Sequence, residues 1–502
     1  MISTNKLSKS EVYFYFLSWT VGIFYSVYHV YIIGNKFIYL FEYVLGPGWS
    51  FLNRKKDKCD DEWEIWVDFI INKLGVWILI HHLGARILNT FCVKVLPSWY
   101  FLITSAFLVF HYDIRIFLIF LFQPVIFSVF ISITKSKILL WIFCYVTCSV
   151  SSYFLISLYD DLYNEEIQLM SATLMWIYLR CISFSIFSQS KKFNWVLICS
   201  FFSYVFYLPS FFLGPIILYD EFYEKLNFKS NRGTYKSCGW LIFQNLRYFA
   251  WLYFTEFLLH FVYINCQQPY TQLLIDTKNE NVWIMYGIGF AMGQFFFLKY
   301  TVVYGLALTW TKAEGYETPN PPKCIARIYL YSEMWRTFDH GLYIFIKKYI
   351  FDPCVKFFKS ETLFCKVWVS FVCFAFIYIW HGQHYFIFMW SFLNYCGIMT
   401  ETIARRISKT TLYFHIKNWL GPRNERRCLA FIAAPLTIIS AISNFYFIGG
   451  VEVAESYLNF FYKHGTYFSL GCLWFFVYAL CHVSMELSAR ENLKRHNLIH
   501  KL

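Results

Sequence analysis

The sequence has little charge for its length. Of its 502 residues, 15% are charged and 58% are hydrophobic, whereas a soluble domain has about 25% charged and about 45–50% apolar residues. This composition excludes an ordinary soluble globular protein. Stretches of about 20 residues with few charges recur along the whole chain, and such stretches are long enough to cross a bilayer as helices. We therefore expect an all-α polytopic membrane protein.

The sequence also lacks CxxC pairs, internal repeats and low-complexity segments. Its 16 cysteines are scattered, so neither a zinc cage nor a disulfide framework is expected, and most should be small core residues. No small-residue cleavage site follows the first apolar stretch, which indicates a retained span and not a signal peptide. We expect one integral membrane domain over residues 1–502.

Apolar stretches long enough to be membrane spans are what the sequence has in abundance. Some are short enough to be re-entrant, so we expect roughly ten to twelve true crossings. The stretches are 12–33, 65–83, 96–111, 116–133, 138–158, 167–187, 195–218, 239–265, 282–310, 363–380, 385–402, 429–448 and 465–485.

The net charge of +13 does not require a nucleic acid partner, because excess lysine and arginine in membrane proteins gather in cytoplasmic loops. Residues 311–362 carry eight basic residues, residues 404–427 carry seven against the single acid Glu425, and the tail after Arg490 is also basic. These segments are predicted to be cytoplasmic, as are both termini. The loop at 34–64 is too mixed in sign to test this prediction.

The run FAFIYIWHGQHYF, residues 374–386, places a histidine at the end of an apolar stretch. Residues 363–402 lie between two cytoplasmic segments and must form a hairpin, so His381 belongs at its luminal end. An imidazole titrates near neutrality and can act as a general base. The alternatives are an interfacial histidine bonded to a backbone carbonyl, or catalysis by His384 instead.

Residues 334–350 are predicted to form one amphipathic helix, partly cytoplasmic and partly re-entrant. Asp339 falls four residues after Trp335, on the apolar side of that helix. A carboxylate there is costly unless it is paired or faces a wet cavity, which favours a functional role. The alternative is a surface ion pair with Arg336, three residues before it.

Other polar residues admit two interpretations. Asn444 lies just inside the predicted luminal turn IGGVEVAES, at a depth similar to that of His381, and could donate to an oxyanion or satisfy a helix end. His81 and His82 are interpreted as packing or interfacial histidines. Cys324, which follows PPK, is more often an inert thiol than a ligand.

Two classes of function are compatible with these residues: an intramembrane enzyme, and a transporter or channel that binds solute or relays protons. Transporters commonly show paired, Gly- or Pro-broken spans in two related halves. No such symmetry is visible here, which favours the enzyme.

Four motifs in the sequence are typical of a known family: MGQFFFLKYTVVYGLAL, PNPPKCIARIYLYSEMWRTFDHGLY, FAFIYIWHG and SNFYFIGGVEV. Together they resemble the membrane-bound O-acyltransferase family, and within it the Hedgehog acyltransferases, the insect members in particular. Weaker similarity covers nearly the whole chain. One departure is YIFDPCVKFF after the Asp339 region, where many relatives have a Tyr-Ile-Pro-Gly-Gly-like segment.

The resemblance implies the membrane-bound O-acyltransferase fold, with membrane helices and re-entrant segments around a central tunnel. It also implies an endoplasmic reticulum enzyme, with the Golgi as a second location. It would transfer palmitate from palmitoyl-CoA to the N-terminal cysteine amine of a Hedgehog signalling-domain precursor, and in insects also to Spitz-type growth factors. Matched by motif, the catalytic residues are His381, Asp339 and Asn444. Trp335 and Arg336 would shape the acyl-CoA end, and Cys324 would be the ligand of a haem b.

Rival functions remain open at this point. A lipid O-acyltransferase of the same fold would act on a lipid hydroxyl, a transporter would move solute, and an inactive scaffold would do neither. His381 argues against the scaffold, because inactive relatives lack the histidine.

Overall fold

A computed structural model describes residues 7–162, 166–192, 194–227, 235–270, 282–359, 362–463 and 465–499. Within these ranges the chain is helical and forms no β-sheet; an isolated bridge joins Gly46 and Lys56. This confirms the all-α prediction.

Nine helices among the described residues are long and apolar enough to cross a membrane, so the chain is a multi-pass membrane protein. They are α1 (Lys9–Lys36), α4 (Leu96–His111), α5 (Ile114–Ile133), α6 (Lys137–Leu162), α7 (Ile167–Ser188), α14 (Val282–Ala313), α18 (Leu363–His381), α20 (Thr411–Lys463) and α21 (Tyr467–Ile499). Two more helices have the length of a span but are not among these nine: α11 (Cys238–Leu258) and α19 (Tyr385–Ile407).

Shorter helices complete the described fold. Near the N-terminal half these are α2 (Asp61–Asp68), a π-helical turn at Phe69–Leu74, α3 (Gly75–Phe91), α8 (Trp195–Val205), α9 (Leu208–Phe211), α10 (Tyr219–Asn227) and α12 (Ile264–Gln267). Further along are α15 (Tyr331–Thr337), α16 (His340–Ile346), a π-helical turn at Lys347–Phe351, and α17 (Asp352–Phe358).

One predicted span is wrong. Residues 195–218 were expected to form a single crossing, but α8 ends at Val205 and the chain then continues through the four-residue helix α9. Pro209 and Pro215 interrupt the backbone pattern, and residues 206–218 are buried in protein. Non-helical backbone is tolerated at membrane depth only where protein or a cavity surrounds it.

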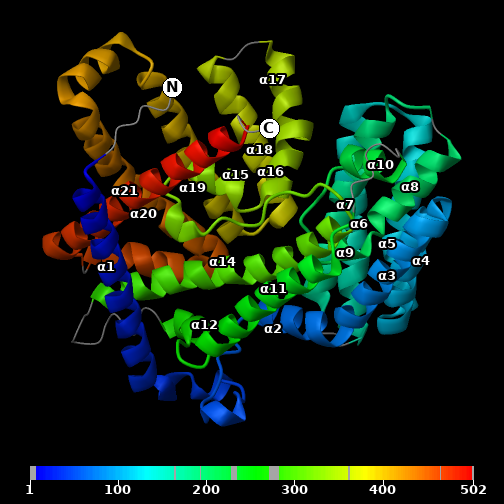
Figure 1. The fold of residues 1–502 in the computed structure, drawn as a ribbon, viewed down its shortest axis with the longest axis horizontal. Helices are drawn as coiled ribbons and strands as arrows, with labels where there is room; N and C mark the ends of the chain where they lie inside the picture. The colour runs from blue at the N-terminus through cyan, green and yellow to red at the C-terminus, as the bar shows by residue number, and fades with distance from the viewer. Residues whose placement is uncertain are drawn as a thin grey trace.

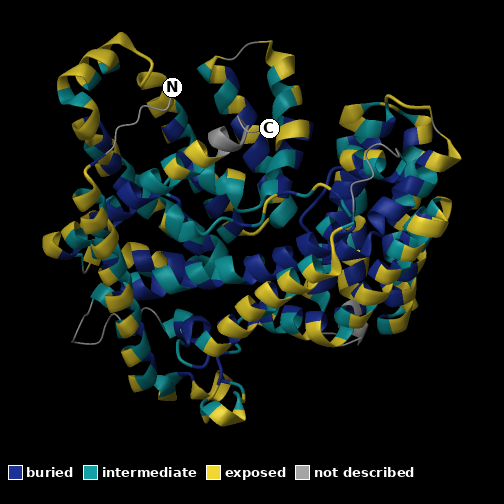
Figure 2. Ribbon diagram, in the orientation of Figure 1, coloured by how far each residue is buried: buried dark blue, intermediate teal, exposed yellow. Residues whose placement is uncertain are grey.

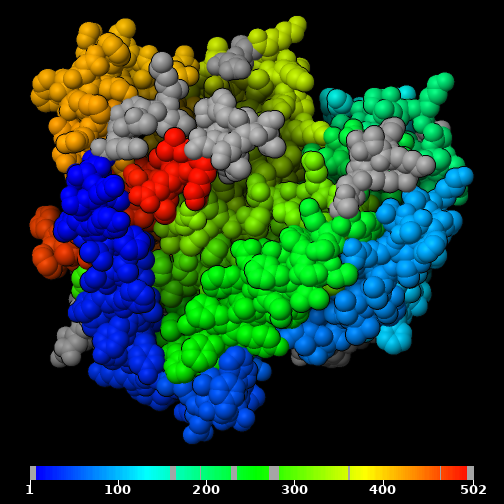
Figure 3. Space-filling view, in the orientation of Figure 1, coloured from blue at the N-terminus to red at the C-terminus, as the bar shows by residue number. Residues whose placement is uncertain are grey.

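α14 is the central helix of the molecule and is buried along much of its length (Figure 2). α1 packs against both α14 and α21. The two ends of the chain therefore lie side by side, as the blue and red surfaces show in Figure 3. α1 therefore links the C-terminal helix α21 to the central helix α14.

Two opposite sides of the molecule can be distinguished. α1 begins, and α21 ends, in the upper half of Figure 1, on the same side as α17 and the basic segment 404–427. The other end of α1 leads to residues 38–60, which lie at the bottom of the figure with α12. The segment 404–427, the start of α1 and the end of α21, all predicted to be cytoplasmic, therefore share the top of this view.

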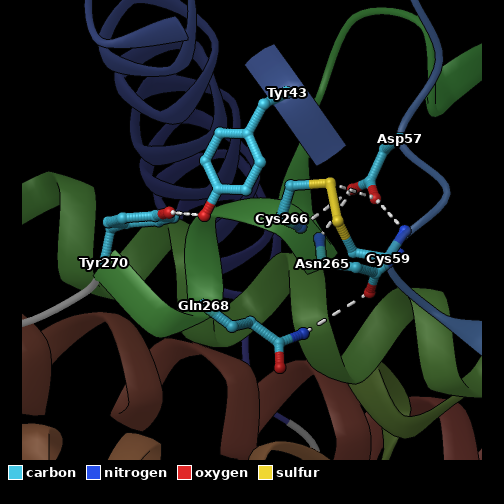
Figure 4. Close-up of a disulfide and its surroundings, with 7 residues drawn as sticks. All are labelled: Tyr43, Asp57, Cys59, Asn265, Cys266, Gln268 and Tyr270. Carbon is cyan, nitrogen blue, oxygen red and sulfur yellow. Dashed lines mark hydrogen bonds between the residues drawn. A yellow bond between two sulfur atoms is a disulfide. The ribbon is translucent and has the colours of Figure 1, made fainter. Parts of the chain in front are cut away.

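A disulfide joins Cys59 to Cys266 on the lower side of the molecule (Figure 4). We expected no disulfide framework, and this single bond was not predicted, because the two cysteines are 207 positions apart and no sequence spacing connects them. Asp57 lies close enough to both sulfur atoms for the three to resemble a metal site. Sulfur atoms bonded to each other are not thiolates, so we assign no metal there.

Candidate active site

His381 is the last residue of α18, and the turn to α19 follows at once. Gly382 has a φ of 102°, a left-handed conformation that glycine adopts without steric cost. The imidazole ring is enclosed edge-on by the rings of Trp380, Trp390 and Phe447, with centroid distances of 4.6, 5.2 and 5.2 Å. These aromatic rings fix the imidazole in position and occupy neither ring nitrogen.

His384, the competing histidine, is exposed and stacks only on Phe386 among the aromatic contacts of its ring. An exposed imidazole is mobile and solvated, whereas the ring of His381 is held. The geometry therefore favours His381 over His384 as the reactive histidine.

Asp339 lies between two helices, not inside one. The single helix predicted over 334–350 is wrong, because α15 ends at Thr337 and Asp339 is the N-cap of α16. Its Oδ1 accepts a hydrogen bond from the Leu342 backbone N–H at 2.9 Å, and its Oδ2 accepts one from the Tyr304 hydroxyl at 3.0 Å. Burial raises the pKa of Asp339, and these two donors oppose that rise.

α16 approaches the buried segment around Ile216 very closely. A Cβ on Gly341 would lie 2.7 Å from the carbonyl oxygen of Ile216, so only glycine permits this packing. The close contact holds the first turn of α16, and with it Asp339, against the protein interior. The alternative ion pair with Arg336 is not observed among the described residues, and Arg336 is exposed.

Asn444 is joined to the aromatic shell of His381. Trp390 donates from Nε1 to Asn444 Oδ1 at 3.1 Å, and Asn444 Nδ2 donates to the Ser440 carbonyl at 2.8 Å. Trp335 packs its ring on Trp390 at 5.3 Å and donates from Nε1 to Asn394 Oδ1 at 3.0 Å. The second hydrogen on Asn444 Nδ2 makes neither of these contacts.

A single cavity of about 1900 Å³ connects these residues. Its lining includes His381, Asp339, Asn444 and Trp335, together with side chains from helices on both sides of the molecule. Most of that lining is apolar. Ligand pockets usually have about 300–1,000 Å³, so this cavity is large enough for a long substrate. Neither Arg336 nor Cys324 lines it.

Cys324 is half-buried, and its Sγ lies 3.7 Å from Gln294 Oε1. A thiol makes only weak hydrogen bonds. The sulfur could therefore bind an iron ion without losing a strong contact. Cys324 is thus chemically suitable as a haem ligand. Haem ligation by Cys324 stays a prediction, and no step proposed below depends on it.

A second buried polar group was missed by the sequence analysis. Glu314, just after α14, accepts hydrogen bonds from the hydroxyls of Tyr100 and Tyr207, both at 2.9 Å. Its other oxygen lies 3.2 Å from His81 Nε2 and 3.4 Å from His82 Nδ1. These five residues, the Glu314 cluster, are buried and do not line the cavity.

The environment of Glu314 favours its ionised form. Burial alone would raise its pKa, but the charge and hydrogen bonding of His81 and His82 lower the pKa of Glu314 to about 2. The interpretation of both histidines as packing residues agrees with their burial. Glu314, their partner, is 232 residues from His82, and no sequence pattern joins them.

Comparison with protein-family models gives one match to this chain. Residues 126–443, more than half of the chain, match the model described as MBOAT, the membrane-bound O-acyltransferase family. The chain belongs to this family. The matched range contains His381 and Asp339 and ends one residue before Asn444.

Two relatives match this membrane-bound O-acyltransferase chain over most of its length, and a third matches less of it. It is 28% identical to the protein-cysteine N-palmitoyltransferase Rasp of Drosophila melanogaster, over 92% of this chain and 91% of that protein. It is 25% identical to the protein-cysteine N-palmitoyltransferase HHAT of Mus musculus, over 86% and 88%. The membrane-bound O-acyltransferase GUP2 of Saccharomyces cerevisiae is 26% identical over 60% of this chain and 46% of that protein.

Proposed function

We propose that this acyltransferase is a protein-cysteine N-palmitoyltransferase. The observation that carries the proposal is the similarity to Rasp and HHAT, which extends over about nine-tenths of the chain. The donor would be palmitoyl-CoA and the acceptor the N-terminal cysteine amine of a Hedgehog signalling-domain precursor, or in insects of a Spitz-type growth factor. The enzyme would act in the endoplasmic reticulum membrane or the Golgi, with both termini cytoplasmic.

The reaction requires loss of a proton from the acceptor. An α-amino group has a pKa of about 7.7–8.0 and arrives largely as an ammonium ion. The amine nitrogen then attacks the thioester carbonyl, the C–S bond breaks, and the products are an amide, CoA thiol and one proton. His381 would take the amine proton as general base and return a proton to the departing thiolate.

Asp339 would hold the acceptor amine. Its carboxylate faces the cavity from the N-cap of α16 and already accepts from Tyr304 and Leu342. Each carboxylate oxygen can accept a further hydrogen bond, and a charged acceptor strengthens such a bond to an ammonium. Asp339 would thus orient the nitrogen toward the thioester before His381 removes its proton.

Asn444 would stabilise the oxyanion. Its Oδ1 is held by Trp390, which fixes the direction of the amide. The uncommitted Nδ2 hydrogen would then donate to the thioester oxygen as negative charge develops there. Removal of one such donor costs about 10²–10³ in rate in other enzymes.

The palmitoyl chain would occupy the apolar part of the cavity. Trp335, which lines it, would contact the acyl-CoA near the thioester. Arg336 is exposed on the predicted cytoplasmic side, and there it would pair with phosphates of the CoA head group. Lipids would contact the outward faces of the spans. If haem b is bound, the sulfur of Cys324 would hold its iron, and the haem would have a structural role.

The second candidate is transfer to a lipid hydroxyl. The similarity to GUP2 supports it, but this covers less of either chain than the similarity to Rasp or HHAT. A transporter is no longer favoured, because nothing in the family match supports it.

The test uses purified protein, labelled palmitoyl-CoA and a peptide that copies a Hedgehog N-terminus. We expect hydroxylamine-stable label on the free-amine peptide and none on the same peptide with its amine acetylated. Label on glycerolipid and on no peptide would overturn the proposal in favour of the lipid acceptor.

A further inference from the structure

The basic segment 404–427 lies in an arch of helices at the upper left of Figure 1, and most of this arch is exposed (Figure 2). α19 ends at Ile407, and α20 begins at Thr411. Gly421, with a φ of 68°, then bends the backbone. Residues 411–420 therefore form a separate helical segment, the arch helix, and beyond the bend α20 is apolar enough to cross a membrane. The arch helix thus lies at the end of a predicted span.

Four of the seven basic residues in the segment 404–427 are neutralised within the protein. The ion pairs are Arg405–Glu401 at 3.2 Å, Lys417–Glu425 at 3.1 Å, Arg426–Glu486 at 3.3 Å and Arg427–Glu11 at 2.9 Å. Glu425 is the single acid of the segment, and it also accepts a hydrogen bond from the Tyr413 hydroxyl at 3.0 Å. The segment therefore has no acid left for its other cations.

Those other cations are Arg406, Lys409 and Arg423. All three are exposed and form no ion pair with any described residue. Two of them precede the arch helix and one follows it. Both ends of the arch helix thus carry positive charge that the protein does not balance, and we refer to these three residues as the unpaired cations.

Between the unpaired cations, the arch helix exposes an apolar stripe. Leu412, Ile416 and Trp419 follow at intervals of four and three residues, so they share one face of a helix. They are 69%, 42% and 85% exposed. Tyr413 and Lys417 hold another face to the protein through Glu425. The helix is therefore anchored on one side, and its apolar stripe is left open.

This combination is typical of a helix that lies in a membrane surface. Such helices bury an apolar stripe at the boundary of head groups and acyl chains, and their cations attract anionic lipids. Tryptophan favours the head-group level, and long basic side chains extend from an apolar stripe to the charged layer. Trp419 and the unpaired cations meet both conditions.

We propose that the arch helix and the unpaired cations bind anionic glycerophospholipids of the adjoining leaflet, on the side predicted to be cytoplasmic. Leu412, Ile416 and Trp419 contact the acyl chains, and the unpaired cations contact the phosphate and carboxylate groups of the lipid head groups. The inference goes beyond the proposed acyl transfer and does not depend on it.

The experiment measures amide hydrogen exchange in peptides that cover residues 405–423, because exchange reports local opening. The full-length protein is placed in phosphatidylcholine nanodiscs that contain increasing fractions of phosphatidylserine. A further sample has phosphatidylcholine nanodiscs and dissolved glycerophosphoserine, which has the head group without acyl chains.

Three variants are compared with wild type. The charge variant combines Arg406→Gln, Lys409→Gln and Arg423→Gln, and the stripe variant is Trp419→Ala. The control variant combines Lys94→Gln, Lys135→Gln and Lys137→Gln. These three lysines are exposed and lie outside the segment 404–427, so the control has the same change in net charge.

We expect phosphatidylserine to slow exchange in the wild type and glycerophosphoserine to leave it unchanged. Each basic residue near an anionic surface contributes about 5-fold in affinity, so the charge variant should lose at least about 10-fold in apparent affinity for phosphatidylserine. Trp419→Ala should lose about 3-fold to about 10-fold, because less apolar area is buried. The control variant should behave as wild type.

Four outcomes would overturn the inference. Equal exchange with and without phosphatidylserine would remove the preference for anionic lipid. Protection by glycerophosphoserine would indicate a site for a free anion. Equal losses in the charge and control variants would indicate a general effect of net charge. Fast exchange in every nanodisc would mean that lipid does not cover the stripe, which would leave this face to a protein partner.

Discussion

The protein contains two buried groups that combine histidine with a carboxylate, and they differ in how many contacts the carboxylate already makes. In the Glu314 cluster, two tyrosine hydroxyls and two imidazoles surround one carboxylate, and the cluster lies outside the cavity. In the candidate active site, His381 is held by aromatic rings alone, and Asp339 keeps unused acceptor capacity toward a cavity of about 1900 Å³.

The difference separates structural from reactive polar groups. A buried charge whose oxygens already contact several partners is costly to disturb, because removal of one member leaves an uncompensated charge. A buried group that faces a cavity with an unused nitrogen or oxygen can bind or react instead. Burial alone does not distinguish them. The following predictions test whether the two groups can be separated by mutation.

The largest expected effect is on catalysis at His381. His381→Gln should lower kcat by about 10²–10⁴-fold, because general acid–base groups contribute that much, with little change in thermal stability. A palmitoyl-transfer assay measures kcat, and the melting temperature of the detergent-solubilised protein measures thermal stability. The control is His384→Gln, which should retain near wild-type activity. Equal losses in both variants would contradict the assignment of His381.

The opposite pattern is expected for Glu314. Glu314→Gln removes the charge that the two histidines and two tyrosines surround, and loss of one partner from a buried charge pair costs about 3–5 kcal/mol. We expect a lowered melting temperature and poor yield, with near-normal KM values for the protein that folds. Glu317→Gln, at an exposed site three residues away, is the control. A stable but inactive Glu314→Gln enzyme would place this cluster in catalysis.

Asp339→Asn tests charge separately from helix capping. Asparagine is as good an N-cap as aspartate, so α16 should keep its start and the protein its stability. Loss of the charge should lower kcat/KM by about 10–100-fold, the value of one hydrogen bond to a charged group. Asp339→Ala should lower both activity and melting temperature. Normal activity in Asp339→Asn would limit this residue to a structural role.

The smallest expected effect is the acid dependence of stability. Because the pKa of Glu314 is lowered from 4.5 to about 2 in the folded protein, its contribution is complete above the unfolded pKa. It is lost as the pH falls through that value toward the folded pKa. Wild type should therefore lose melting temperature more steeply than Glu314→Gln between about pH 5 and about pH 3. Parallel curves would contradict the linkage.

The helical fold could be predicted from the sequence because runs of apolar residues mark spans without reference to distant contacts. α18 ends at His381, close to the predicted end of the span 363–380. The break before α16 was missed, because the apolar period was followed through Phe338. Aspartate is a preferred N-cap residue, so Asp339 could have been taken as the start of a second helix.

Long-range polar partners could not be predicted in the same way. Lys299 is 239 residues from Asp60, and the apolar residues around each give no sign of the other. Of the candidate residues, the structure brings His381, Asp339, Asn444 and Trp335 to one cavity and leaves Arg336 and Cys324 outside it. Roles for all six remain predictions, because a role depends on substrate.

The Cys59–Cys266 bond also has a consequence for synthesis. The second cysteine is made 207 residues after the first, which at about 5–20 residues per second is an interval of roughly 10–40 s. Throughout this time Cys59 is a free thiol with no partner. The bond can form only where an oxidising compartment meets both residues, so a chain inserted upside down would stay reduced. Formation of the disulfide therefore depends on the orientation in which the chain from Cys59 to Cys266 is inserted into the membrane.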